Sequence, residues 1–128
     1  MDKKARLARL QEECAAYFNE LYAPDQKVYV FGDGDPQARV MLVGEAPGAQ
    51  EALLGKPFVG KAGKNLDEFL ERTQLKRAEL YITNTVTFRP VKISDKVRAS
   101  NRSPTREEIG LFLPWLQRWI DLFEPRLI

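Results

Sequence analysis

A short apolar run that stops at a glycine-rich turn constrains the fold of this chain more than any other feature. Positions 40–43 read Val-Met-Leu-Val, and Gly-Glu-Ala-Pro-Gly follows at 44–48. An apolar run of this length, bounded by turn residues, predicts a buried strand. Open α/β sheets bind their ligands beyond the carboxyl ends of the strands, where a glycine-rich loop leads into a helix. We therefore expect the binding site of this chain in the loop over 44–63.

A second predicted strand brings an asparagine to the same edge of the sheet. Residues 66–73 carry apolar side chains at helical spacing, and residues 80–86 are β-branched and aromatic. A strand, a helix and a strand over this length predict a right-handed crossover with parallel pairing. Asn84, near the end of the second strand, is therefore expected at the same edge as Glu45.

Two longer helices are predicted outside this unit. Residues 2–21 place apolar side chains on one stripe, so Cys14, which lies on it, is expected to pack as a small buried hydrophobe. Ser103-Pro104-Thr105, followed by two glutamates, predicts the start of the other helix. Pro114 is expected to kink this second helix or to end its first turn.

Shorter signals complete an α/β pattern. Residues 27–31 predict a strand or extended segment, 32–36 a polar turn, and 124–128 the lead-in to a further parallel strand. Alternating strands and helices predict an α/β fold with three layers, α/β/α, around a short parallel sheet. The 128 residues suffice for one domain and are too few for two.

The composition excludes some classes of protein and leaves others open. One cysteine cannot form an internal disulfide and fits a reducing compartment. No apolar run approaches the roughly 20 residues that a membrane span requires, so a cytoplasmic location is expected. The net charge of +2 is too small to indicate nucleic-acid binding by itself, and the chain has no histidine.

Basic residues gather in one segment beside the expected site. Between positions 89 and 106, Asp95 is the single acidic residue among several arginines and lysines. A loop that binds an anionic backbone and a merely solvated loop both have this composition. The basic residues are Arg89, Lys92, Lys96, Arg98, Arg102 and Arg106.

Four motifs occur in an order and at spacings that resemble a known enzyme superfamily. They are Phe-Gly-Asp-Gly-Asp-Pro at 31–36, Gly-Glu-Ala-Pro-Gly at 44–48, Gly-Lys-Pro-Phe-Val-Gly at 55–60, and Thr-Asn at 83–84 continuing to Arg-Pro at 89–90. Together, from about Phe31 to Trp115, they resemble the uracil-DNA glycosylase superfamily, and most closely its bacterial and archaeal iron–sulfur branch, family 4. The resemblance implies an enzyme that flips uracil out of DNA and hydrolyses its N-glycosidic bond.

The resemblance also implies a role for each residue of the site. Glu45 would position or activate water and stabilise the cationic sugar, Phe58 would stack on the flipped base, and Asn84 would bind the uracil edge. A turn carboxylate, a packed phenyl ring and a turn amide are the respective alternatives. Gly44 and Gly48 would let the backbone approach the base. The basic segment would follow DNA phosphates through Arg89, Lys92, Lys96, Arg98 and Arg102.

The chain departs from this branch at the positions that hold its iron–sulfur cluster. Family 4 binds the cluster through four cysteines. Here Phe88 and Phe112 occupy the two downstream positions, and the N-terminal pair reduces at best to Cys14. Apolar side chains at these positions predict that packing replaces the cluster. We therefore expect no metal site and no cofactor.

A second departure concerns the histidine with which the superfamily donates to the departing uracil oxygen. This chain has no histidine, and it stops at Ile128, before the second signature could begin. A truncated form and a natural half-domain both fit, and the abrupt stop favours residues 1–128 as the N-terminal portion of a single glycosylase-like domain. We expect weak or absent activity, and an unpaired sheet edge that allows self-association.

Two other functions remain compatible with the sequence. A non-catalytic nucleic-acid or nucleotide-binding module would keep the pocket and the basic segment without hydrolysis. A Rossmann-like enzyme would bind phosphate with the loop over 44–63. The chain lacks both a Walker lysine pattern and a GxGxxG motif after the strand, which weakens this last hypothesis.

Overall fold

The central sheet brings the ends of two parallel strands side by side. The computed structural model describes residues 2–24, 27–93, 99–101 and 103–128. In it, β2 (Met41–Gly44) pairs in parallel with β3 (Tyr81–Asn84), so that Gly44 lies opposite Asn84. The predicted parallel pairing of these two strands is confirmed.

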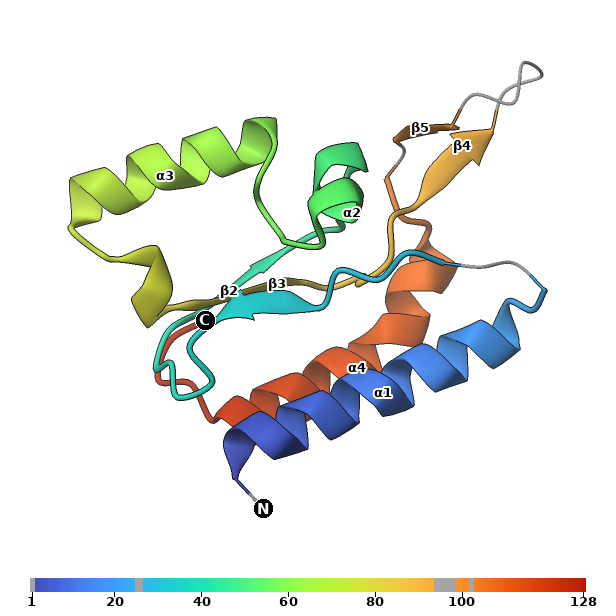
Figure 1. The fold of residues 1–128 in the computed structure, drawn as a ribbon, viewed down its shortest axis with the longest axis horizontal. Helices are drawn as coiled ribbons and strands as arrows, with labels where there is room; N and C mark the ends of the chain where they lie inside the picture. Colours follow the sequence, from blue (N-terminus) through green and yellow to red (C-terminus); the bar gives the residue numbers. More distant parts are fainter. Residues whose placement is uncertain (1, 25–26, 94–98, 102) are drawn as a thin grey trace.

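Helices cover both faces of this sheet (Figure 1). On one face, α1 (Lys3–Leu21) and α4 (Arg106–Phe123) run side by side. On the other lie α2 (Ala49–Leu54) and α3 (Lys61–Thr73), and a 3₁₀ turn, η1 (Arg77–Glu79), leads from α3 into β3. The three-layer α/β/α architecture is therefore confirmed. The short helix α2 is an element that the sequence pattern does not predict.

The sheet is mixed rather than purely parallel, because its third strand is antiparallel. β1 (Gly32–Gly34) pairs with β3, and the strand order is β1-β3-β2. This strand lies in the stretch for which the sequence predicts a turn. A Cβ atom at Gly32 would lie 2.6 Å from Cζ of Tyr81, so a residue without a side chain lets β1 pass close to that ring. Pairing with β3 thus overrides the local turn preference.

Two further segments extend the pairing beyond the named strands. The predicted extended segment 27–31 makes an isolated antiparallel bridge, Tyr29 with Phe88. Near the C-terminus, Leu127 forms a parallel bridge with Val40, and its carbonyl accepts a hydrogen bond from the Met41 N–H at 2.9 Å. The segment predicted to lead into another parallel strand therefore lies along the outer edge of β2.

The long helix α4 begins where the sequence predicts and continues through its proline. The Thr105 side chain accepts a hydrogen bond from the Glu108 N–H at 3.1 Å, and the Glu108 carboxylate accepts one from the Thr105 N–H at 2.9 Å. Pro114 does not end the first turn but lies inside the helix on its exposed side. The carbonyl that loses its intrahelical partner belongs to the exposed Gly110, where solvent can replace the bond.

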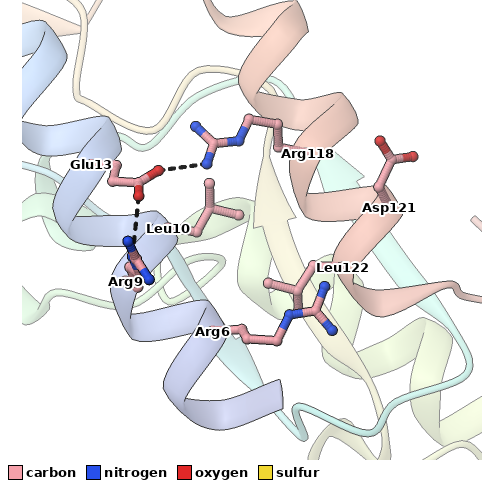
Figure 2. Close-up of a pocket in the computed structure, with 7 residues that line it drawn as sticks. All are labelled: Arg6, Arg9, Leu10, Glu13, Arg118, Asp121 and Leu122. Atoms are coloured by element: carbon pink, nitrogen blue, oxygen red, sulfur yellow. Dashed lines mark hydrogen bonds and ion pairs between the residues drawn. The ribbon is translucent and has the colours of Figure 1, made fainter. Parts of the chain in front are cut away.

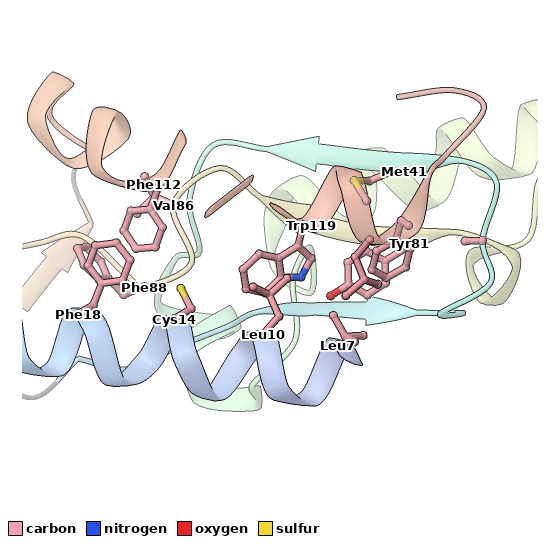
Figure 3. Packing of buried hydrophobic residues seen from close by; sticks show 13 residues of the cluster. Leu7, Leu10, Cys14, Phe18, Met41, Tyr81, Val86, Phe88, Phe112 and Trp119 are labelled. Carbon is pink, nitrogen blue, oxygen red and sulfur yellow. The ribbon is translucent and has the colours of Figure 1, made fainter. Parts of the chain in front are cut away.

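The main hydrophobic core lies between the sheet and the α1–α4 layer (Figure 3). Leu7, Leu10, Cys14 and Phe18 project into it from α1, which is the stripe that the helical spacing predicts. A smaller cluster under α3 contains Leu70, Leu80 and Ile82. Within the described part of the chain, no helix is long and apolar enough to cross a membrane.

Candidate functional site

Three of the residues predicted for the site meet where β2 and β3 end. Gly44 and Asn84 are paired across the two strands, and the Phe58 ring approaches them from the loop after α2. A Cβ atom on Gly44 would collide with Oδ1 of Asn84 and would lie 2.5 Å from Cζ of Phe58. The absence of a side chain at Gly44 therefore allows the amide and the ring to come together.

Asn84 presents an amide without a partner at this point. The residue is 4% exposed, and its side chain makes no hydrogen bond to the described part of the chain. An amide offers one acceptor and two donors, which can match the edge of a pyrimidine.

Glu45 lies beside this group on a turn with a fixed backbone. The carbonyls of Gly44 and Glu45 accept hydrogen bonds from the N–H groups of Thr85, at 2.9 Å, and Val86, at 3.0 Å. The Glu45 side chain is exposed, and within the described ranges its carboxylate has no hydrogen-bond or ion-pair partner. The structure therefore brings the carboxylate to the sheet edge that carries the amide and the ring, in contact with solvent.

Glu51, which the sequence analysis missed, organises the loop that carries Phe58. Its carboxylate accepts hydrogen bonds from the backbone N–H groups of Gly48 at 2.9 Å, Val59 at 3.0 Å and Gly60 at 2.6 Å. Burial disfavours the charged form, but these three donors outweigh it and lower the pKa of Glu51 below its usual value. Because Gly48 gives its N–H to Glu51, the predicted contact of Gly48 with the base would have to use other atoms. The spacing Gly-x-x-Glu, that of a capping box, is the signal that could have identified Glu51.

Arg77, also missed, holds the same loop from η1. Its guanidinium donates to the carbonyl of Phe58 at 3.1 Å and to that of Pro57 at 2.5 Å. Asp67 on α3 lies 3.6 Å from the guanidinium. No local sequence pattern links Arg77 to a loop some twenty residues earlier, because tertiary packing creates the contact.

Comparison with known proteins identifies the family of the chain. A profile of the uracil DNA glycosylase superfamily matches residues 31–128. The chain belongs to the uracil-DNA glycosylase superfamily. The resemblance that the four motifs predict is thereby confirmed.

Its relatives include proteins named type-4 uracil-DNA glycosylase. The one from Pyrobaculum aerophilum is 44% identical over 103 residues, which cover 80% of this chain and 48% of the relative. The one from Sulfurisphaera tokodaii is 43% identical over 98 residues, covering 76% and 41%. The one from Thermotoga maritima is 37% identical over 99 residues, covering 77% and 47%. The chain thus spans about half the length of the curated relatives that it matches.

The residues of this superfamily member do not fit an iron–sulfur cluster. Phe112 stacks on Phe18 with ring centroids 4.0 Å apart, and Phe88 meets Phe112 edge-on at 5.1 Å. Cys14 is fully buried in the same hydrophobic cluster (Figure 3), and burial raises the pKa of its thiol to about 12. Phenyl rings have no lone pair to give to iron, and one cysteine cannot replace four thiolates. Cys14, Phe88 and Phe112, the positions that correspond to cluster ligands, thus lie together in one hydrophobic cluster.

The basic segment is in part a β-hairpin rather than the expected loop. β4 (Val91–Ile93) and β5 (Ala99–Asn101) pair antiparallel, and the hairpin projects past the end of β3 (Figure 1). Arg89 is half-buried just before it. Lys96, Arg98 and Arg102 lie outside the described residues, and the structure gives no side-chain placement for Lys92.

A separate hollow of about 400 Å³ lies between α1 and α4, on the other face of the sheet from α2 (Figure 2). Glu13 accepts a hydrogen bond from Arg118 at 2.5 Å and pairs with Arg9 at 3.4 Å. The hydrogen bond from Arg118 is the main cause that lowers the pKa of Glu13. The Glu13–Arg118 pair joins the two helices, whereas Arg9 and Glu13 both belong to α1. Exposed pairs of this kind contribute little to stability.

Proposed function

We propose that this chain carries the uracil-recognition part of a uracil-DNA glycosylase and that it acts on uracil-containing DNA. The observation that carries the proposal is the buried Asn84 amide, which lacks a partner among the described residues and lies beside the Phe58 ring. The relatives named type-4 uracil-DNA glycosylase support the choice of ligand.

In the proposed reaction, the flipped uracil stacks on Phe58 and Asn84 binds its polar edge. The bond between the sugar C1′ and the base nitrogen breaks, and its electron pair leaves with uracil. Water then bonds to C1′ and its proton passes to the uracil anion, so that the products are an abasic sugar and free uracil. The Glu45 carboxylate stabilises the cationic sugar and positions this water.

We expect the reaction to be slow in the chain of 128 residues. The superfamily supplies a donor to the departing uracil oxygen from a histidine, and these 128 residues contain no histidine. Removal of one such donor lowers the rate of other enzymes by about 10²–10³-fold. The pocket should therefore bind uracil better than it cleaves.

The proposal includes three further points about the setting of the protein. The basic residues Arg89, Lys92, Lys96, Arg98 and Arg102 would contact DNA phosphates. Copies of the chain would associate through the edge of β2, where the described residues pair only Val40 and Met41, with Leu127. The protein would act in the cytoplasm, as expected for a DNA-repair protein with a single buried cysteine.

Matched oligonucleotides test this function. Single-stranded DNA with one uracil, and the same DNA with thymine, are incubated with the protein and then assayed for abasic sites by alkaline cleavage. We expect slow cleavage of the uracil strand alone, and its loss in Glu45→Ala. The variant Glu68→Ala, an exposed carboxylate on α3, serves as the control that keeps activity. Cleavage of both strands alike, or full activity in Glu45→Ala, would contradict the proposal.

A non-catalytic binding module is the second candidate, and the missing histidine favours it. Such a module would bind the uracil strand more tightly than the thymine strand and leave both intact. Fluorescence anisotropy on the same oligonucleotides separates the two functions. Uracil-selective binding without abasic sites at high protein concentration would assign the chain to the module.

A further inference from the structure

Phe58 has a backbone conformation that needs support from its surroundings. Its φ angle is 55°, in the left-handed region that side chains other than glycine rarely adopt. On one side, the Phe58 backbone is pressed against the first turn of α3, where a Cβ atom on Gly63 would lie 2.5 Å from the Phe58 carbonyl carbon. A residue held in such a conformation at a binding site indicates that other contacts fix it there.

One peptide group of this loop is held at both of its ends. The carbonyl of Phe58 accepts from Arg77, and the N–H of Val59, which belongs to the same peptide group, donates to Glu51. The contacts continue on either side, since Arg77 also binds the carbonyl of Pro57 and Glu51 also binds the N–H of Gly60. The two partners, the Arg77 guanidinium and the Glu51 carboxylate, are both charged, so these hydrogen bonds are of the stronger, charge-assisted kind.

We propose that Glu51 and Arg77 are positioning residues that fix the peptide group between Phe58 and Val59 and thereby aim the Phe58 ring at a flipped uracil. This inference rests on the proposed function. Loss of these contacts would free the Pro57 and Phe58 carbonyls, and with them the φ and ψ angles that hold Phe58 in its left-handed conformation. The Phe58 ring would then no longer be held against Gly44 and Asn84. Asp67 orients the guanidinium from α3, 3.6 Å away, so the clamp joins α2, α3 and η1 around the loop.

Binding selectivity provides the first test. Single-stranded oligonucleotides with uracil or thymine are titrated against the wild type, Glu51→Gln, Arg77→Met and Arg77→Lys. We expect the ratio of uracil to thymine affinity to fall about tenfold in Glu51→Gln and Arg77→Met, because the ring no longer meets the base. Affinity for the thymine strand should stay constant, which a merely unfolded variant would not show. Arg77→Lys keeps one donor and should recover part of the ratio.

The exposed pair Glu68 and Arg72 on α3 supplies the matched control, with a contact of 3.0 Å and no link to the loop. Glu68→Gln and Arg72→Met make the same chemical changes and should leave the ratio unchanged. A ratio within twofold of wild type in both Glu51→Gln and Arg77→Met would overturn the proposal.

Amide hydrogen exchange separates this proposal from the proposed function. In Glu51→Gln, exchange should accelerate at Gly48, Val59 and Gly60 and stay constant in β3. A wild-type protein that prefers neither strand would overturn the uracil function, and the clamp would then be judged by exchange alone. Unchanged exchange at these three amides in Glu51→Gln would overturn the clamp.

Discussion

At the scale of single residues, the candidate site depends on the missing side chain of Gly44. A Cβ atom there would meet Oδ1 of Asn84 and the ring of Phe58. We expect Gly44→Ala to displace one of them and to lower uracil affinity by at least about tenfold, since each such recognition contact is worth about 1–3 kcal/mol. Isothermal titration with a uracil-containing oligonucleotide measures this change.

Gly110 provides the control for that substitution. It lies in α4 with open space around its Cα, so alanine meets no other atom there. Gly110→Ala should raise the free energy of unfolding by about 0.5–1 kcal/mol, because alanine has the higher helix propensity. It should leave uracil affinity unchanged. Equal affinities of Gly44→Ala and Gly110→Ala would contradict the proposed packing of the site.

The pKa of Glu51 predicts how acid acts on the loop. Its pKa is lower in the folded protein than the ordinary value of 4.5, because backbone donors outweigh burial. A lowered folded pKa contributes stability above the unfolded value, and this contribution is lost as the pH falls through the folded value. The difference in thermal midpoint between wild type and Glu51→Gln should therefore be full at pH 6 and shrink below about pH 4.5. A difference that is constant down to pH 3 would show that the charge of Glu51 does not stabilise the loop.

At the scale of secondary-structure elements, an aromatic core joins α1, α4 and the segment after β3. Phe112 stacks on Phe18 and meets the edge of Phe88. We expect Phe112→Ala to lower the free energy of unfolding by about 3–5 kcal/mol, because it leaves a cavity among three elements. Phe112→Leu, which keeps most of the volume, should cost less than about 1.5 kcal/mol. Urea unfolding followed by circular dichroism measures both.

Leu113, the next residue of α4, is 50% exposed and serves as the control. Leu113→Ala should change stability by less than about 1 kcal/mol. A similar loss of stability in Leu113→Ala and Phe112→Ala would show that the aromatic core does not stabilise the packing of the two helices.

At the scale of the whole molecule, we predict that copies of the protein pair through the outer edge of β2 at high concentration. Along β2, the carbonyls of Val40 and Gly44 face β3, and the Met41 N–H faces the outer edge. Because successive residues of a strand direct their backbone groups to opposite edges, the Val43 N–H faces the outer edge as the Met41 N–H does. A second chain could pair with it there. Val43→Pro removes this donor without removing a bond to β3.

In analytical ultracentrifugation, we expect the sedimentation coefficient of the wild type to rise with protein concentration. We expect Val43→Pro to sediment as a monomer. The far-ultraviolet circular dichroism of the variant should match that of wild type, which controls for loss of the fold. Monomeric wild type at all concentrations would contradict association through this edge. Persistent association in Val43→Pro would place the contact on another surface.

Much of the molecule followed from local sequence patterns. The stripe of α1, the cap of α4 and the parallel pairing of β2 with β3 come from periodicity and turn residues, which act over a few positions. The motifs around Glu45, Phe58 and Asn84 indicated the family. Of the predicted site residues, Gly44, Phe58 and Asn84 meet where β2 and β3 end. The helix stripe and the cap were predictable because they depend on neighbours in the sequence, and the strand pairing because a strand, a helix and a strand of this length form a parallel crossover.

The tertiary structure decided what depends on contacts between distant segments. β1 formed in a predicted turn because pairing with β3 outweighed the preference of its glycines for a turn. Arg77 reached the loop of Phe58 only through the packing of α3 and η1, which no local spacing encodes. The sequence by itself determined which residues could bind a base. Tertiary contacts decided how the ring and the amide are aimed, because the contacts of Arg77 join segments that lie far apart in the sequence.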